Sequence, residues 1–442
     1  ALDAQGAIDV DHAESGGNFT ATAQGNISTG LNSIITAGDI VINAGGLVDL
    51  GNSSAGGLID VTGSQIDYIS LLAADSVTLL AQSSATAAIG NGNITGGSTT
   101  ATSGAIGIST AFGSTILTGT TNAATTLTVS SSGNSSIANA ISGDNASITG
   151  ASVTLNNGTI GGNLTLNAAA GDIDGNGTIT VAGGIDLDAT GNVGFGELDA
   201  QSGTFTIDAG GNILFADASG SDLVTMNAGG GIDGGNLTAT NALTLHGGTI
   251  AIGDAVAGNV DITSDGAIDF NTINAAGRAF FDGNSGGLTG DSIIAAGAVV
   301  MNISDDVNIG VINAGANVVM DLNFGGSLVA DTIFSATNVS LTSAGGTIAA
   351  NSIGAAKSGQ GTVNVDATNG IDIRNIAGNN IYLSADAGLV NISNNVDATN
   401  ILVASGEAVS VVSQLGLSVR ADASNGDIGL SSAGNLDVQG AR

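Results

Sequence analysis

Short groups of apolar residues recur along the chain at nearly constant spacing. Each group follows the pattern apolar-x-apolar-polar and usually runs into a small or glycine-rich turn, as in FTIDAGG from Phe205 and VSLTSAGG from Val339. The groups begin at Phe205, Val224, Leu243, Val260, Ala279, Val299, Val318, Val339, Val363, Ile381, Ile401, Leu417 and Leu436. Twelve intervals between the first and the last give a period of about 19 residues, which predicts a stacked repeat.

A second apolar signal lies inside each repeat, roughly eight to eleven residues after the first group opens. It consists of apolar pairs five residues apart: Ile268 and Ile273, Leu288 and Ile293, Leu328 and Ile333, Ile348 and Ile353, Ile371 and Ile376. Each repeat therefore has three inward-pointing stretches, which predicts three short strands. The dipeptides GG, GN, NG and DG between them supply the tight turns and positive φ angles of a closed coil.

These patterns predict an all-β fold, a single parallel β-helix or solenoid over 1–442 with about 19 residues per coil. Right-handed winding is the expectation for parallel strand crossovers. Stacking about 23 coils at the strand spacing would give a rod on the order of 110 Å long. Residues 84–150 are less regular, and we expect them to form coils with longer outward turns rather than a separate domain.

The composition supports this fold. Hydrophobic residues make up 42% of the chain and charged residues only 10%, whereas disorder requires low hydrophobicity with dense charge. Proline is absent. Because proline cannot donate a backbone hydrogen bond, its absence favours a solenoid, in which nearly every strand is paired on both sides, over a sandwich with open loops. Cysteine is also absent, so the fold uses neither disulfides nor thiolate metal sites.

The formal net charge is −33, from 38 acidic and 5 basic residues. Repulsion excludes nucleic acid and anionic membranes as partners. No run of 18 apolar residues occurs, so we expect no membrane insertion in this segment. The acidic surface is expected to keep an all-β rod soluble and to discourage sideways aggregation.

An enzyme is the alternative from another class, since a carbohydrate-active β-helix could be a polysaccharide lyase or hydrolase. A lyase needs a base near acidic ligands, and a hydrolase needs paired carboxylates. The available bases are His12, His246, Arg278, Lys357, Arg374, Arg420 and Arg442, and they are well apart in sequence. Stacked turns bring aspartates together by repetition alone, so we expect no catalytic residues. A groove lined by carboxylates and an Arg or Lys would favour the enzyme.

One segment resembles a calcium loop. Asp172, Asp174 and Asn176, followed by Gly177, match the first half of the D-x-D-x-N-G pattern and are candidate calcium ligands. The match ends at Gly183, which stands where a bidentate Glu belongs; Asp186 or Asp188 of a neighbouring coil could complete the set. An ordinary Asp/Asn turn explains the same residues and is the preferred interpretation. No other cofactor is indicated.

Asparagine begins several Asn-x-Ser/Thr triplets, and this triplet also coincides with the opening of a strand in the repeat. We therefore interpret most of these triplets as structural rather than as glycan acceptors. The triplets begin at Asn18, Asn26, Asn52, Asn93, Asn163, Asn236, Asn302, Asn338 and Asn391.

Repeats such as GGNLTLNAAAGDIDGNGTITVAGGIDLDATG (161–191) and GTVNVDATNGIDIRNIAGNN (361–380) resemble the shaft of filamentous-haemagglutinin-type exoproteins of the two-partner secretion route, and of large bacterial adhesins. The resemblance covers nearly the whole chain and is one of coil pattern. It implies an extracellular or cell-surface location on a Gram-negative bacterium, with adhesion or fibre formation on host or environmental surfaces. The sequence enters and leaves in repeat pattern, so we expect either a larger chain or copies stacked end to end in a filament.

Overall fold

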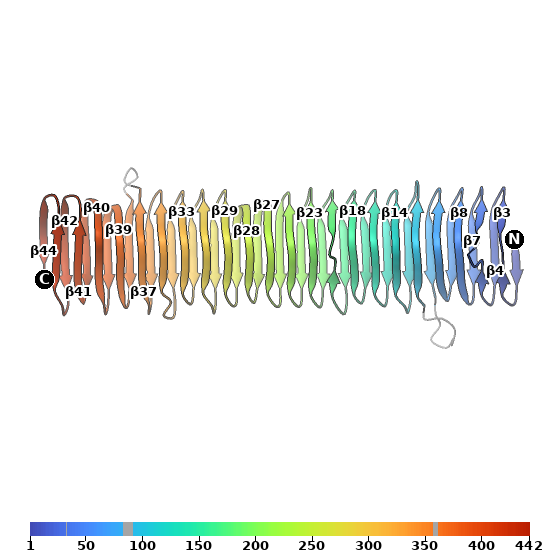
Figure 1. The fold of residues 1–442 in the computed structure, drawn as a ribbon, viewed down its shortest axis with the longest axis horizontal. Helices are drawn as coiled ribbons and strands as arrows, with labels where there is room; N and C mark the ends of the chain where they lie inside the picture. The colour runs from blue at the N-terminus through green and yellow to red at the C-terminus, as the bar shows by residue number, and fades with distance from the viewer. Residues whose placement is uncertain (32, 83–91, 357–360) are drawn as a thin grey trace. The chain divides into compact units, whose positions relative to one another are not determined.

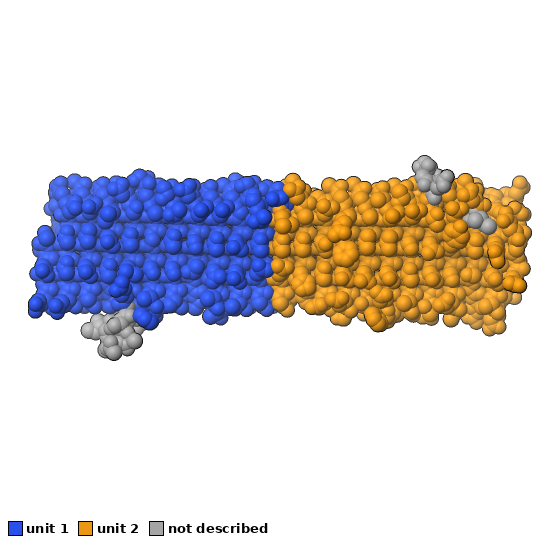
Figure 2. Space-filling view, turned by 180° about the vertical axis from the view of Figure 1, so that it is seen from behind, with its two compact units in different colours: residues 1–222 blue, residues 223–442 orange. Residues whose placement is uncertain are grey.

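The structure is a computed structural model that describes residues 1–31, 33–82, 92–356 and 361–442 (Figure 1). These residues form a parallel β-solenoid of about 22 turns, with about 19 residues per turn and no helix, which confirms the predicted fold class. The chain divides into two compact units, 1–222 and 223–442 (Figure 2). The expectation of one uninterrupted solenoid stays a prediction.

Unit 1 holds the first twenty-five strands that the structure describes. They are β1 (Leu2–Ala4), β2 (Ile8–Asp9), β3 (Ala13–Ser15), β4 (Phe19–Ala23), β5 (Ile27–Ser28), β6 (Ile34–Thr36), β7 (Ile40–Ala44), β8 (Leu47–Ala55), β9 (Ile59–Gly63), β10 (Gln65–Ala73), β11 (Val77–Ala81), β12 (Ile94–Ala101), β13 (Ile106–Thr110), β14 (Thr115–Ala123), β15 (Leu127–Ser131), β16 (Ser135–Ser142), β17 (Ala146–Gly150), β18 (Val153–Ile160), β19 (Leu164–Ala168), β20 (Ile173–Asp174), β21 (Thr178–Val181), β22 (Ile185–Ala189), β23 (Val193–Ala200), β24 (Phe205–Ala209) and β25 (Ile213–Gly220).

Unit 2 holds the remaining described strands. They are β26 (Leu223–Ala228), β27 (Ile232–Gly247), β28 (Ile250–Ser264), β29 (Ile268–Ala275), β30 (Ala279–Gly283), β31 (Leu288–Ala295), β32 (Val299–Ile303), β33 (Val307–Ala314), β34 (Val318–Leu322), β35 (Leu328–Ser335), β36 (Val339–Ser343), β37 (Thr347–Ala355), β38 (Thr362–Ala367), β39 (Gly370–Ala385), β40 (Leu389–Gly406), β41 (Ala408–Ser413), β42 (Leu417–Ala423), β43 (Ile428–Ser432) and β44 (Leu436–Ala441).

Each coil has three inward-facing stretches, two of which are usually fused into one bent strand. β5 and β6 are separate strands, and both pair in parallel with the single strand β8. In β29 the burial pattern alternates on either side of two consecutive outward residues, Asn271 and Thr272, which mark the bend between Ile268 and Ile273. The apolar pairs five residues apart therefore lie on either side of a bend.

Two coils are longer than the usual 19 or so residues, yet the strands before and after them still pair in register. Thr102 bonds to Ala74, 28 residues earlier, and Thr362 bonds to Asn338, 24 residues earlier. In the stretch predicted to be less regular, 84–91 lie outside the described residues. Its remainder forms β12–β17, with register shifts after Gly96 and Leu117. The added length explains why the structure has about 22 turns rather than the expected 23.

The core consists of ladders of aliphatic side chains. Val318 pairs with Val339, which pairs with Val363, and all three are at most 1% exposed. Leu341 is 0% exposed one pleat further along the same strand. Burying such a side chain stabilises the fold by about 1.5–3 kcal/mol, and every coil repeats the contribution.

Two of the aromatic residues in the core lie opposite a glycine of the next coil. Phe270 pairs with Gly290, and Tyr68 pairs with Gly96. A Cβ at Gly290 would collide with the Phe270 ring, and a Cβ at Gly96 would collide with the Tyr68 ring. Phe270 also stacks on Phe281, with the ring centroids 5.6 Å apart. At these two positions the ladder accommodates a large ring because the paired residue has no side chain.

Polar ladders connect the coils at residues that precede an inward-facing stretch. In six Asn-x-Ser/Thr triplets the Asn Oδ1 accepts the backbone N–H of the corresponding residue in the next coil, at 2.8–3.2 Å. The asparagines are Asn18, Asn26, Asn93, Asn163, Asn236 and Asn338. Each such bond stabilises the stack by about 0.5–1.5 kcal/mol. These six asparagines therefore have a structural role in the stack.

We expect Leu341→Asp to lower the free energy of unfolding by about 3–5 kcal/mol, because it places an unpaired charge in the core. Ser340→Asp is the matched control, since Ser340 is the outward-facing neighbour on the same strand and pairs with Val319 and Asn364, which carry no charge. Urea unfolding of both variants tests the inward assignment. Equal loss in the two variants would contradict it.

Candidate functional site

The predicted calcium loop spans the end of one short strand and the start of another. Asp172 precedes β20, Asp174 ends it, and Asn176 lies in the bend before β21. The Asp172 Oδ1 accepts the backbone N–H of Asn192 at 2.6 Å and its Nδ2 amide at 3.2 Å. The Asn192 Oδ1 in turn accepts the N–H of Asn212 at 2.8 Å. Asp172 is therefore the first member of a polar ladder of the kind that opens other strands.

The rest of the loop does not gather further acidic ligands. Asp174 faces outward, and partial burial followed by the charge of Asp172 raises its pKa. Asp186 and Asp188 lie on β22, which pairs with β19 and β24, whereas β20 pairs with β18 and β23. Within the described ranges, no group of three or more His, Asp or Glu side chains is placed to hold a metal. Calcium, which takes six to eight oxygens, would need backbone and water ligands here.

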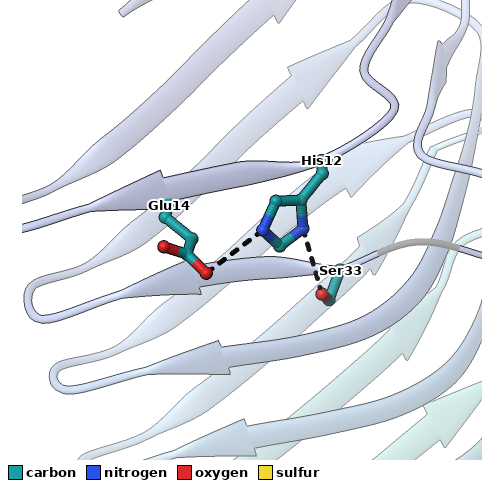
Figure 3. A network of polar contacts seen from close by, with 3 residues as sticks. All are labelled: His12, Glu14 and Ser33. Carbon is teal, nitrogen blue, oxygen red and sulfur yellow. Dashed lines mark hydrogen bonds and ion pairs between the residues drawn. The ribbon is translucent and has the colours of Figure 1, made fainter.

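The bases needed by an enzyme are dispersed. In Figure 3, His12 contacts Glu14 through Nε2 at 3.2 Å and Ser33 through Nδ1 at 3.3 Å, and all three side chains are exposed or partly exposed. Arg278 pairs with Asp261 at 3.2 Å, and its guanidinium carbon lies 5.6 Å from the ring centre of Phe280.

Three of the other basic side chains are exposed to solvent. His246 faces solvent from β27, between Asn227 and Thr263 of the neighbouring coils. Arg420 and Arg442 are exposed as well. Lys357 lies outside the described residues. The last base, Arg374, lines a hollow.

The Arg374 hollow, in unit 2, has a volume of about 310 Å³ and crosses four neighbouring coils. Its apolar part consists of Val329, Ala330, Ala349 and Ala350. Its polar part consists of Asp331, Asn351, Asp372, Arg374 and Ser393. It therefore combines two carboxylates, an amide, a hydroxyl and a guanidinium on one surface.

The Asp49 hollow, in unit 1, has a volume of about 370 Å³. Asp49 and Asp67 occupy the same register position on β8 and β10, so their carboxylates lie on adjacent coils. Partial burial, followed by the charge of Asp67, raises the pKa of Asp49. Gln65 donates a hydrogen bond from Nε2 to the Asp67 Oδ2 at 2.8 Å. A paired carboxylate with a raised pKa can retain a proton for acid–base work.

Tyr68 forms the inner wall of the Asp49 hollow. It is 6% exposed, and its hydroxyl lies 2.6 Å from the Thr99 Oγ1. Burial raises the pKa of Tyr68 to about 12, and the hydrogen bond to Thr99 opposes this shift. Its phenol is therefore neutral and structural at physiological pH.

The sequence carried weak signals for both hollows. VDL at 48–50 and IDY at 66–68 place an aspartate at equal positions of adjacent coils. Ala330 and Ala350 lie between Ile309 and Ile373 in their ladder, and this lack of bulk leaves the depression beside Arg374. Neither pattern is distinctive without the register of the coils.

The fold defines the class of this protein as a parallel β-solenoid. No family model, curated protein or solved structure matches the chain. In the part of the chain that the structure describes, no helix is long and apolar enough to cross a membrane.

If Asp172, Asp174 and Asn176 bind calcium, a chelator will lower the melting temperature and calcium will restore it, because a ligand that binds only the folded state stabilises it. Asp174→Asn is the informative variant, since the Asp174 carboxylate accepts no backbone bond in the ladder that Asp172 begins. If the segment is an ordinary turn, neither chelator nor calcium will change the melting temperature of the parent chain or of Asp174→Asn. A calcium response that persists in Asp174→Asn would place the ion elsewhere.

Proposed function

We propose that this chain is a structural shaft, a stiff acidic rod that extends a surface protein from a Gram-negative bacterium or assembles outside the cell. The observation that carries the proposal is the continuity of coil-to-coil contacts within each unit. Parallel backbone pairing, apolar ladders and polar ladders recur from coil to coil. A surface that repeats from coil to coil suits a protein that spans a distance, whereas an enzyme needs one distinct active site.

The charge distribution supports the same function. Ion pairs join His12 to Glu14 and Arg278 to Asp261, but the sequence has 38 acidic side chains and only 5 Lys and Arg to neutralise them. Most carboxylates therefore remain uncompensated on the outer surface. Their mutual repulsion opposes sideways association of such shafts at moderate ionic strength.

The proposed partners follow from the geometry of the coil. Each coil pairs with its neighbour through the same parallel register, so a further segment of this chain or a second copy could continue the pairing. The similarity of the repeats to haemagglutinin-type exoproteins supports placement outside the cell, where attachment to host or environmental surfaces would use the shaft as a spacer.

A carbohydrate-active enzyme is the second candidate. The Asp49 hollow favours it, because two adjacent carboxylates with a raised pKa on one of them resemble the acid–base requirements of glycoside hydrolysis. The Arg374 hollow also has the combination of carboxylates and a basic residue that a polysaccharide lyase would need.

Immunogold electron microscopy of intact source cells tests the shaft. We expect label outside the outer membrane, on thin filaments that are lost when the gene is deleted and return on complementation. Protein confined to the cell interior would contradict the proposal.

An activity screen separates the two candidates. We expect neither reducing ends nor unsaturated products from neutral and acidic polysaccharides. Turnover that disappears in Asp49→Asn or Arg374→Gln, but not in Arg420→Gln, would replace the shaft with the enzyme.

A further inference from the structure

The Arg374 hollow arises from small side chains on both sides of the coil wall. Along the inward ladder, Ala330 and Ala350 lie between Ile309 and Ile373. On the outward side, Ala349 lies between Val329 and Asp372. Two neighbouring coils thus lack bulk where the flanking coils have it, and the polar residues at the bends surround the depression.

The two carboxylates of the hollow are already held in place. The Asp331 Oδ1 accepts the Nδ2 amide of Asn351 at 2.9 Å, and the Asp372 Oδ1 accepts that of Asn391 at 2.8 Å. Each of these bonds engages one carboxylate oxygen. The second oxygen of each carboxylate is able to accept a hydrogen bond from a bound molecule, and the ladder restrains the orientation of both groups.

Arg374 is available for a ligand. Its side chain is exposed, and it makes no ion pair or hydrogen bond within the described residues, in contrast to Arg278, which pairs with Asp261. A guanidinium presents five N–H donors in a planar fork that matches a carboxylate in two parallel hydrogen bonds. The chain has a net charge of −33, so a guanidinium without an ion-pair partner in a hollow places a positive charge on a mostly negative surface.

We propose that the Arg374 hollow binds a hydroxylated monocarboxylate, of the kind presented by a uronic acid residue of an acidic polysaccharide. The ligand carboxylate pairs with Arg374, and its hydroxyls donate to the second oxygens of Asp331 and Asp372. A volume of about 310 Å³ lies at the lower end for small-molecule sites, which suits one or two sugar rings.

The flanking charges set the selectivity of the site. Asp331 and Asp372 repel a second negative charge, so phosphate and sulfate are disfavoured although the guanidinium alone would accept them. A simple carboxylate such as acetate lacks the hydroxyl donors, and glucose lacks the carboxylate. The inference goes beyond the proposed function, because a shaft needs no ligand and a site on its side would attach it to an acidic polysaccharide matrix.

The experiment titrates the whole chain with glucuronate and galacturonate, with glucose, acetate and phosphate as comparison ligands, by calorimetry and saturation-transfer NMR. We expect a uronate Kd on the order of 1 mM and binding of each comparison ligand weaker by about tenfold or more. Arg374→Gln should weaken uronate binding by about tenfold or more. Arg420→Gln, an exposed arginine outside the hollow, should leave it unchanged.

Asp331→Asn separates hydroxyl recognition from simple charge attraction. It should weaken uronate binding while improving acetate and phosphate binding, because a repelling charge is removed. The proposal is overturned if no uronate binds up to about 50 mM, if Arg374→Gln binds as well as the parent, or if acetate or phosphate binds as tightly as uronate. Melting temperatures of all variants, expected to be unchanged at these exposed positions, show that a loss reports the site.

Discussion

Parallel backbone pairing in register between successive coils is the interaction on which the rest of the structure depends. It places each residue over its counterpart about 19 positions away, so one favourable side-chain choice is repeated as a ladder. The aliphatic core, the asparagine ladders and the pairing of aromatic rings with glycines all follow from this register. A register error of one residue would turn every inward side chain outward.

In-register pairing also explains which parts of the fold can be predicted from the sequence. The spacing of Val299, Val318 and Val339 predicts the coil, its three inward stretches and its core, because a ladder needs only like residues at a constant interval. Coil lengths vary where turns lengthen, and the paired positions Ile66 and Ile94 are further apart than the period suggests. Contacts beyond such turns cannot be aligned by counting from the sequence.

The candidate sites were harder to predict for a related reason. Asp172 has the residue pattern of a calcium loop, yet its carboxylate accepts the backbone of the next coil. A short motif does not show whether an Asp serves a ligand or the ladder. Arg374, in contrast, belongs to no motif, and only the absence of bulk at Ala330 and Ala350 gives it a depression to line.

Removal of one whole coil tests the dependence on register most directly. Deleting 299–317 joins β31 to β34 and allows Val318 to take the place of Val299 opposite Ala279. Deleting only 299–306 removes β32 and its turn, which leaves half a coil and takes away the strand that pairs with β30 and β34. In urea, we expect cooperative unfolding with a nearly unchanged midpoint for the whole-coil deletion and a large loss of stability for the shorter one. Equal tolerance of both deletions, or unfolding of the whole-coil variant, would contradict this dependence on register.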